Sequence, residues 1–356
     1  MSKNSILFFS RSPMNYVMFQ PIHLRMKNDP RLSFAFTGKP EEHYHSVDEI
    51  YRPFFTNREE TINRLFFARW ARPDIYISAD IFLACPWAKT KLHIFHGVSF
   101  KGKAYSEKIL EYDKIFIIGD YMLRRFIEKK ILEENDPRIL KVGMPKTDRL
   151  VNGSLDKTAI LRSLGLSGAR PVVIYAPTWR GTSSLNTMGE AIFRKMKTMD
   201  MDFLVKVHDL SLNPKINVKD WGKRLLELED EHLKVIRDPD IIPYLFASDL
   251  LISDASSTAN EFTLLDRPVI FMDVPNLFKK YSETIDLETW GRKIGVVART
   301  AEELPGLIAH ALSHPGELSS VRKAAARDIF YNHGAATDAA VKALYTILQL
   351  DPKGTE

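Results

Sequence analysis

Two polar segments of this chain stand directly after short apolar runs that are typical of β-strands. Lys206 and His208 close the first run, and Ser253 and Asp254 follow the second. Small hydroxyl residues between a strand and a helix present backbone N–H groups and the positive end of the helix dipole, which suits a phosphate. A histidine on a neighbouring strand end can face the same phosphate. The two segments therefore predict a site for a nucleotide-diphosphate donor in an α/β domain.

The second segment continues with residues that could hold the rest of a nucleotide. Ser256 and Ser257 offer side chains for the start of a helix, and Glu261 follows about one turn later. A carboxylate at that place could accept hydrogen bonds from ribose hydroxyl groups. The competing interpretations are plain helix capping for the two serines and a solvated helix face for Glu261.

A third polar segment follows the first predicted strand of the second half of the chain. Thr178 and Arg180 flank Trp179 there, after Pro177 has fixed the turn. A guanidinium fork matches phosphate oxygens, so Arg180 is a candidate for the donor phosphates, and Thr178 belongs to the same candidate site. A surface arginine beside a buried tryptophan is the alternative.

A histidine in the first half of the chain is placed to act as a base. His96 and Gly97 follow the apolar run 92–95, which indicates an exposed strand end. The pKa of an imidazole lies near neutrality, so His96 could take a proton from a hydroxyl group; a structural histidine capping a turn is the alternative. Within the run, His93 is expected to pack in the core. Lys101 is expected to be solvated, and contact with an acidic acceptor is the alternative.

The composition of the chain excludes several classes of protein. The chain has 356 residues, 45% hydrophobic content and a formal charge of +5, which suits a soluble protein of two domains with anionic ligands. Cys85 is the single cysteine and is expected to be a buried thiol. We find no nucleic-acid motif, no third ligand beside His43 and His45 for a metal, no signal-peptide pattern and no apolar run of about 18 residues. A cytoplasmic location, or a peripheral one on the inner face of the membrane, is expected.

Apolar strand patterns alternate with helical patterns along the whole chain, which predicts parallel sheets. We therefore expect two doubly wound Rossmann-like domains, 1–150 and 151–356, that face a cleft, with a helix near 335–348 that crosses back to the first domain. Ligands bind at the carboxyl ends of such strands. The predicted strands are 6–9, 32–36, 75–77, 92–95 and 114–118 in the first half, and 172–175, 203–207, 233–235, 250–252 and 269–271 in the second.

One segment suggests contact with a membrane. Between Arg58 and Arg72, the residues Ile62, Phe66 and Trp70 recur at helical spacing among four arginines. Such an amphipathic basic helix could lie on an anionic membrane surface, or its apolar stripe could pack on its own sheet. A second predicted helix, 121–130, has the same ambiguity.

Taken in order, these segments resemble the CDP-glycerol glycerophosphotransferase family, which includes the teichoic acid primases and polymerases. The matching region runs from about His96 to Pro268. The segments that carry the resemblance are His96-Gly97, 143–148 (GMPKTD), 175–180 (YAPTWR), 206–208 (KVH) and 253–257 (SDASS) with Glu261 and 265–268 (LDRP).

The resemblance implies a GT-B fold and a metal-independent transferase without a cofactor. Such an enzyme moves an alditol phosphate, for example glycerol phosphate, from a CDP-activated donor to a hydroxyl of a lipid-linked saccharide or cell-surface polymer. By this resemblance His96 is the catalytic base, with Arg180 and His208 completing the catalytic set. The residues implied at the donor are Thr178, Lys206, Ser253, Asp254, Ser256, Ser257 and Glu261.

Three other functions stay open at this point. A GT-B glycosyltransferase would hold a nucleotide-sugar in the same place, with attack on the anomeric carbon. A sugar-nucleotide epimerase is a more distant option. A non-catalytic scaffold for polymer synthesis is a third, and the presence of His96, Arg180 and His208 together argues against it.

Overall fold

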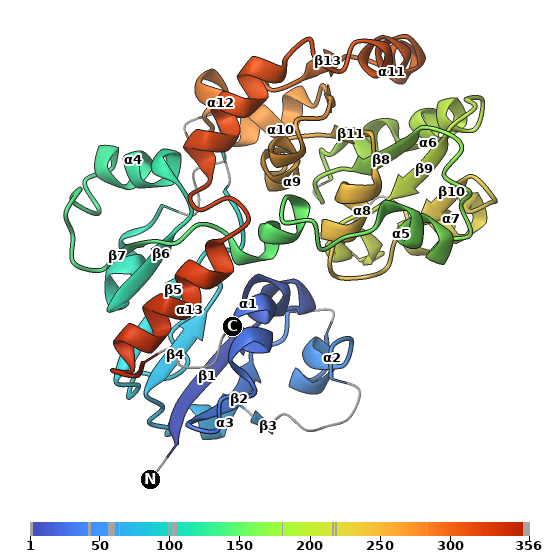
Figure 1. The fold of residues 1–356 in the computed structure, drawn as a ribbon. Coiled ribbons are helices and arrows are strands. Elements are labelled where there is room, and N and C mark those ends of the chain that lie inside the picture. Colours follow the sequence, from blue (N-terminus) through green and yellow to red (C-terminus); the bar gives the residue numbers. More distant parts are fainter. Residues whose placement is uncertain are drawn as a thin grey trace. The chain divides into compact units, whose positions relative to one another are not determined.

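A computed structural model describes residues 3–41, 44–55, 61–63, 65–98, 100, 105–179, 181–215, 217, 219–282 and 284–351 of the chain. These form two compact units (Figure 1). Unit 1 comprises Met1–Val98, Tyr105–Asp148 and Asp328–Glu356. Unit 2 comprises Arg149–Arg327 and also includes Phe100, whose carbonyl accepts a hydrogen bond from the Asp286 N–H at 2.8 Å.

Unit 1 is built on a parallel sheet of seven strands in the order β3-β2-β1-β4-β5-β6-β7. Its central strands are buried on both faces, which explains their nearly unbroken apolar sequences. Around Phe8 and Tyr16, stacked and edge-to-face aromatic rings fill one side of the core. The strands are β1 (Asn4–Ser10), β2 (Leu32–Gly38), β3 (Thr61–Asn63), β4 (Ile75–Ser78), β5 (Thr90–Ile94), β6 (Lys114–Ile117) and β7 (Ile139–Lys141).

The helices of unit 1 connect these strands and include one from the end of the chain. They are α1 (Pro13–Met26), α2 (Val47–Tyr51), α3 (Leu65–Ala68), η1 (Glu107–Glu111), α4 (Asp120–Glu128) and α13 (Ala336–Ile347), with η2 (Pro145–Leu150) at the boundary with unit 2. Helix α13, red in Figure 1, packs against α1.

Specific contacts attach this last helix to unit 1. The carboxylate of Asp148 accepts hydrogen bonds from the N–H groups of Ala336 and Thr337 at 2.9 and 2.7 Å, and so caps α13. Gly143 has a φ of 95°, and a Cβ there would lie 2.3 Å from the carbonyl oxygen of Tyr331, so only glycine fits. The GMPKTD segment therefore binds the C-terminal part of the chain to unit 1.

Unit 2 is built on a parallel sheet of six strands in the order β10-β9-β8-β11-β12-β13. In both sheets the strand order reverses next to the first strand, between β1 and β4 and between β8 and β11. Open α/β sheets bind ligands at this place. The strands are β8 (Val172–Ala176), β9 (Asp202–Val205), β10 (Leu233–Val235), β11 (Leu250–Ser253), β12 (Val269–Met272) and β13 (Val296–Ala298).

The core of unit 2 contains Tyr175, Phe193 and Trp221, and the Trp221 indole donates to Asn186 Oδ1 at 2.9 Å. Short helices link the strands. They are α5 (Lys157–Ser163), α6 (Ser184–Met196), η3 (Asp209–Leu212), α7 (Trp221–Leu228), α8 (Ile242–Ala247), α9 (Ser257–Phe262), η4 (Thr263–Leu265), α10 (Pro275–Lys280), η5 (Leu287–Gly291), η6 (Ala301–Glu303), α11 (Leu304–Ser313) and α12 (Ser319–Ile329), the last of which reaches unit 1.

The strand predictions are confirmed, because all ten predicted runs are strands and all pairings are parallel. Three short strands were not predicted: β3, β7 and β13. The predicted basic helix at 58–72 is wrong, because Thr61–Asn63 pairs with β2 and α3 has only four residues. Packing of its aromatic stripe on the sheet is also wrong for Phe66 and Trp70, which are 68% and 70% exposed. The second predicted basic helix, α4, does pack on its unit through Tyr121 and Phe126.

The predicted burial of the cysteine and of one histidine is confirmed. Cys85 is fully buried, and its thiol donates to the Ala71 carbonyl at 3.1 Å. Burial raises the pKa of this thiol. His93 lies between the rings of Phe95 and Tyr112, with centroids 4.5 and 5.0 Å away.

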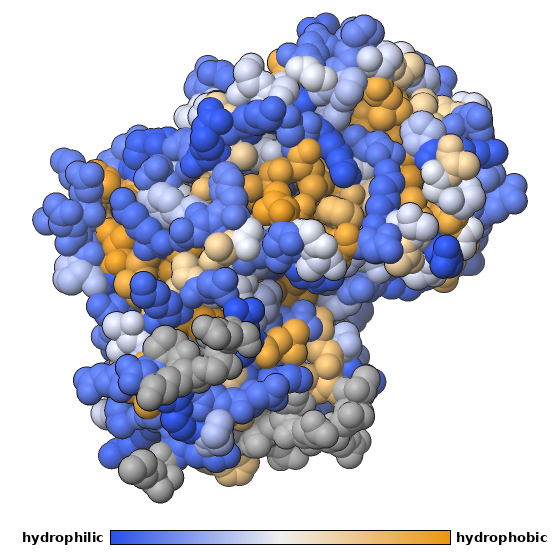
Figure 2. Space-filling model, viewed as in Figure 1, coloured by the Kyte–Doolittle hydropathy of each residue, from blue (hydrophilic) through white to orange (hydrophobic). Residues whose placement is uncertain are grey.

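Figure 2 shows a mostly hydrophilic surface in which hydrophobic residues form separate groups. None of the helices in the described part of the chain is long and apolar enough to cross a membrane. Over the same residues, His, Cys, Asp and Glu form no group of three or more that could hold a metal ion.

The buried His93 should make unit 1 sensitive to mild acid. Burial lowers the pKa of His93 to about 3, so the folded protein keeps the ring neutral while the unfolded chain takes up a proton below about pH 6.5. The free energy of unfolding should therefore fall by about 2 kcal/mol between pH 7 and pH 5 through this group alone.

Urea unfolding of the wild type and of His93→Leu, followed by tryptophan fluorescence at both pH values, measures this contribution. The variant has its own baseline stability, so only the loss between pH 7 and pH 5 is compared. An equal loss in the two proteins would contradict the assignment.

Candidate functional site

Polar residues gather at the carboxyl edge of the second sheet. The loops after β9, β8 and β11 lie next to one another there, because these strands are neighbours in the sheet. Lys206 and His208 follow β9, Thr178 follows β8, and Asp254 follows β11. The sheet reverses its order between β8 and β11, so this edge has the position at which doubly wound sheets bind ligands.

Two buried side chains hold the loops of this edge together. Asp254 Oδ2 accepts hydrogen bonds from the N–H groups of Thr178 and Ser184, at 3.2 and 3.1 Å. Ser253 Oγ donates to the carbonyl oxygen of Ala176 at 2.6 Å. Both side chains connect the end of β11 to the end of β8. They form the framework of the site, and their part in donor binding stays a prediction.

The backbone determines which nitrogen of His208 carries the hydrogen. His208 Nδ1 accepts a hydrogen bond from the N–H of Leu210 at 3.2 Å. A nitrogen that accepts from an amide has no hydrogen of its own, so the neutral ring carries its hydrogen on Nε2. The ring lies beside Trp179, with centroids 5.8 Å apart. His208 therefore offers an N–H donor, which suits a phosphate oxygen.

Of the two other predicted cations of the donor site, the structure describes Lys206 but not Arg180. Lys206 is largely buried, and its ammonium group lies 3.8 Å from Asp209 Oδ1 in the same loop. Arg180 lies outside the described residues. So do Lys101, His43 and two arginines of the predicted basic helix, Arg58 and Arg64.

The segment after β11 begins a short helix. Ser256 is the N-cap of α9 and accepts a hydrogen bond from the Thr258 N–H at 3.2 Å, so the capping interpretation is confirmed for this residue. Ser257 is the first residue of the helix. Glu261 lies one turn later and is only 2% exposed, so a solvated helix face is wrong for it. A buried carboxylate so close to the strand end needs polar partners, as ligand-binding carboxylates do.

His96 belongs to unit 1 and follows β5. Its Nδ1 lies 3.2 Å from the carbonyl oxygen of Ala79 and 3.6 Å from Asp80 Oδ1. A carbonyl oxygen can only accept, so Nδ1 carries the hydrogen and Nε2 has the free lone pair. The side chain is 50% exposed. His96 therefore has the tautomer and the accessibility of a general base, opposite to the tautomer of His208.

Sequence reasoning missed Asp80, which lies beside this base. Asp80 follows β4, the strand next to β5, and its backbone carbonyl accepts from Ser78 Oγ and from the Tyr112 hydroxyl. The loop is thus held in place, with its carboxylate near the imidazole. A carboxylate directly after a predicted strand was the available signal, but the strand order was needed to pair it with His96.

The structure therefore gathers eight of the predicted residues at one edge of unit 2, and places His96 at the corresponding edge of unit 1. The eight are Thr178, Lys206, His208, Ser253, Asp254, Ser256, Ser257 and Glu261.

Comparison with known proteins adds a family and a fold. A sequence model of the family described as CDP-Glycerol:Poly(glycerophosphate) glycerophosphotransferase matches residues 90–345, which include His96 and all the candidate residues of unit 2. The teichoic acid glycerol-phosphate primase of Bacillus spizizenii is 26% identical over 202 residues, covering 55% of this chain and 46% of the relative. The primase of Bacillus subtilis is 26% identical over 208 residues, covering 57% and 48%. The chain thus matches about half the length of these curated primases.

Solved structures show the same fold. The wall teichoic acid polymerase TagF has a TM-score of 0.71 at 16% identity, covering 97% of this chain and 90% of that one. A UDP-N-acetylglucosamine 2-epimerase has a TM-score of 0.59 at 15% identity, covering 99% of each chain. The predicted α/β fold of the GT-B type, with two Rossmann-like units, is confirmed.

Proposed function

Because the chain belongs to the CDP-glycerol:poly(glycerophosphate) glycerophosphotransferase family, we propose that it transfers an alditol phosphate from a CDP-activated donor. The acceptor is a hydroxyl group of a lipid-linked saccharide or cell-surface polymer. The observation that carries this proposal is the pair of opposite histidine tautomers. His96 presents a lone pair that can take a proton, and His208 presents an N–H that can bind a phosphate.

The reaction is an in-line displacement at phosphorus. His96 Nε2 takes the proton of the acceptor hydroxyl, and the oxygen attacks the distal phosphorus of the donor. The bond from that phosphorus to the bridging oxygen breaks, and CMP leaves with the electron pair. His208 Nε2–H and Arg180 stabilise the charge on the leaving phosphate. Positioning and charge stabilisation supply most of the rate in such reactions.

The nucleotide is held by the segment after β11. Backbone N–H groups near Ser256 and Ser257 contact the phosphates, and the buried Glu261 accepts from the ribose hydroxyls. Ser253 and Asp254 connect this segment to the loop after β8, which contains Thr178, by hydrogen bonds. Asp80 orients His96 through the Nδ1 side of the ring.

We also propose that an aromatic patch on unit 1 meets an anionic membrane surface. Phe66, Phe67 and Trp70 are 68%, 62% and 70% exposed, and the exposed Arg69 directly precedes Trp70 in the sequence. Trp87 is exposed as well, and the neighbouring Cys85 contacts Ala71, so Trp87 belongs to the same region. Aromatic rings and arginines are the side chains that lie at the level of lipid headgroups. The patch is defined as Phe66, Phe67, Trp70 and Trp87.

The donor is expected to be a cytidine nucleotide. A ligand that binds only the folded protein stabilises it, by about 2.7 kcal/mol at one hundred times its dissociation constant. CDP-glycerol, CDP-ribitol, CDP and CMP should therefore raise the melting temperature, whereas UDP and UDP-sugars should not. Selective stabilisation by uridine nucleotides would favour the glycosyltransferase or epimerase alternative, and no response to any nucleotide would favour the scaffold.

Removing the base should slow turnover strongly without weakening the donor complex. For His96→Ala we expect a rate about 10²- to 10⁴-fold lower, because general-base catalysis contributes that much, with CDP-glycerol affinity unchanged. Release of CMP from CDP-glycerol in the presence of acceptor measures the rate.

The matched control for this variant is His310→Ala, which removes an exposed histidine of α11 that pairs with Glu317. It should behave like the wild type. Full turnover in His96→Ala would exclude His96 as the base.

Membrane contact can be tested by flotation with vesicles of phosphatidylglycerol and phosphatidylcholine. Each aromatic ring that enters the interface stabilises binding by about 1 kcal/mol, so Phe66→Ser/Trp70→Ser should lower the membrane partition coefficient about thirty-fold. Leu226→Ser, which changes an exposed apolar residue of unit 2, is the control. Equal flotation of the wild type and the double variant would refute the assignment of the patch.

A further inference from the structure

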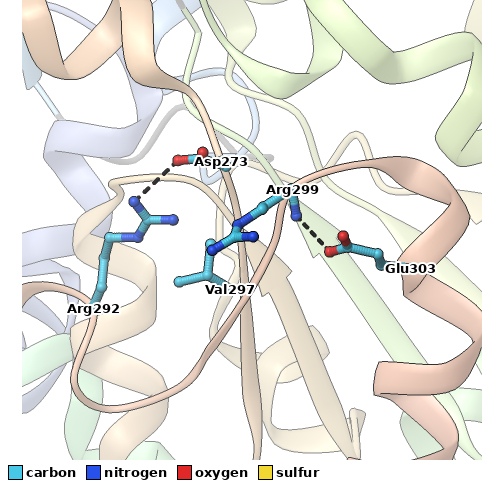
Figure 3. Close-up of a pocket in the computed structure, with 5 residues that line it drawn as sticks. All are labelled: Asp273, Arg292, Val297, Arg299 and Glu303. Atoms are coloured by element: carbon cyan, nitrogen blue, oxygen red, sulfur yellow. Dashed lines mark hydrogen bonds and ion pairs between the residues drawn. The ribbon is translucent and has the colours of Figure 1, made fainter.

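A polar pocket of about 600 Å³ opens in unit 2, at the edge of the sheet that also carries the candidate donor site. It is lined by Asp273, Arg292, Val297, Arg299 and Glu303 (Figure 3). These residues surround the ends of β12 and β13, whereas the donor-site loops follow β9, β8 and β11. Adjacent strands are about 4.8 Å apart, so β13 stands roughly 10 Å from β11. One phosphate could not serve both places.

One guanidinium of the pocket is fixed by its neighbours. Arg292 Nη1 lies 3.1 Å from Asp273 Oδ1, and its guanidinium carbon lies 5.0 Å from the centre of the Phe278 ring. Asp273 is itself held, because its N–H donates to the Ala298 carbonyl at 2.8 Å and joins the ends of β12 and β13. Arg292 therefore needs little ordering when a ligand arrives.

The second guanidinium points into the same space. Arg299 donates its backbone N–H to Glu303 Oε2 at 2.8 Å, and its guanidinium forms no ion pair with any residue that the structure describes. In Figure 3 the guanidinium groups of Arg292 and Arg299 both turn toward the pocket, with Val297 beside them. The N–H groups of the two guanidinium forks match the oxygens of an anion that lies between them.

The two carboxylates that line the pocket limit which anions could bind there. Asp273 and Glu303 line the pocket beside the two arginines, so the charges balance. A compact anion without hydroxyl groups would meet these carboxylates unfavourably. A ligand with a phosphate and adjacent hydroxyls satisfies all four side chains, because hydroxyl groups donate to carboxylates.

We propose that this pocket binds a polyol phosphate, with the phosphate between Arg292 and Arg299 and the hydroxyls at Asp273 and Glu303. The subsite rests on the proposed function in one respect, since a growing chain of alditol phosphates would supply this ligand. Its distance from the donor-site loops suits a unit of the acceptor chain beyond the reacting end. The pocket therefore adds a contact that recognises polymer already made.

Phosphorus NMR titrations of the full chain with sn-glycerol 3-phosphate test the proposal. Charge-assisted hydrogen bonds from a guanidinium are strong, so Arg299→Gln should weaken binding about ten-fold or more, and Arg299→Lys should lose less. The control is Arg170→Gln, which removes a partly exposed arginine that precedes β8, at the opposite edge of the sheet, and pairs with Asp200. It should bind like the wild type. Far-ultraviolet circular dichroism of each variant verifies its fold.

Three probes distinguish a free anion, a single polyol phosphate and a polymer as the ligand of the pocket. Inorganic phosphate should bind at least ten-fold more weakly than sn-glycerol 3-phosphate, and a synthetic tri(glycerol phosphate) should bind at least as tightly. Tighter binding of the oligomer identifies a polymer subsite, and equal binding identifies a site for single polyol phosphates. Equal affinity for inorganic phosphate would mean an adventitious ion only and would overturn the proposal.

Competition with CDP keeps this proposal separate from the proposed function. CDP should neither displace sn-glycerol 3-phosphate nor bind more weakly to Arg299→Gln. Full displacement by CDP, or unchanged glycerol 3-phosphate affinity in Arg299→Gln, would overturn the subsite. If the wild type binds sn-glycerol 3-phosphate but not CDP, that result would contradict the proposed donor and would support the pocket proposal.

Discussion

The carboxylate of Asp254 is buried where the second sheet reverses its strand order, and the candidate donor site is built around it. A buried carboxylate is costly unless hydrogen bonds replace its water. Backbone N–H groups of Thr178, in the loop after β8, and of Ser184, the first residue of α6, provide two of them. The loops after β8 and β11 are therefore held in one geometry. This contact therefore fixes the positions of the residues that would touch a nucleotide.

The two histidines show how the backbone can assign chemical roles to identical side chains. His96 meets a carbonyl oxygen through Nδ1, and His208 meets an amide N–H through the same atom. The first ring is therefore left with an acceptor and the second with a donor. Both follow strands of sheets with the same strand order. The folds are alike, and the difference lies in which backbone group each loop presents.

Sequence reasoning was most successful where burial on both faces produces long apolar runs, as in β1, β8 and β11. It missed the short edge strands β7 and β13, although it found β10, which also has three residues at a sheet edge. It failed around Phe66, where a local amphipathic pattern competed with strand pairing to β2. At the site it found the residues after the strands, but the framework role of Asp254 and the proximity of Asp80 to His96 depend on strand order. The burial of Glu261 likewise depends on tertiary packing.

The attachment of α13 to unit 1 through Asp148 has a consequence for the order in which the chain becomes folded during synthesis. Nearly all of unit 2 lies in the continuous stretch Arg149–Arg327, whereas unit 1 also needs the segment that begins at Asp328. A ribosome therefore releases a complete second sheet with its helices before it releases the helix that Asp148 caps. Domains generally fold as units as they emerge. In this chain the half that is synthesised first is the half that is completed last.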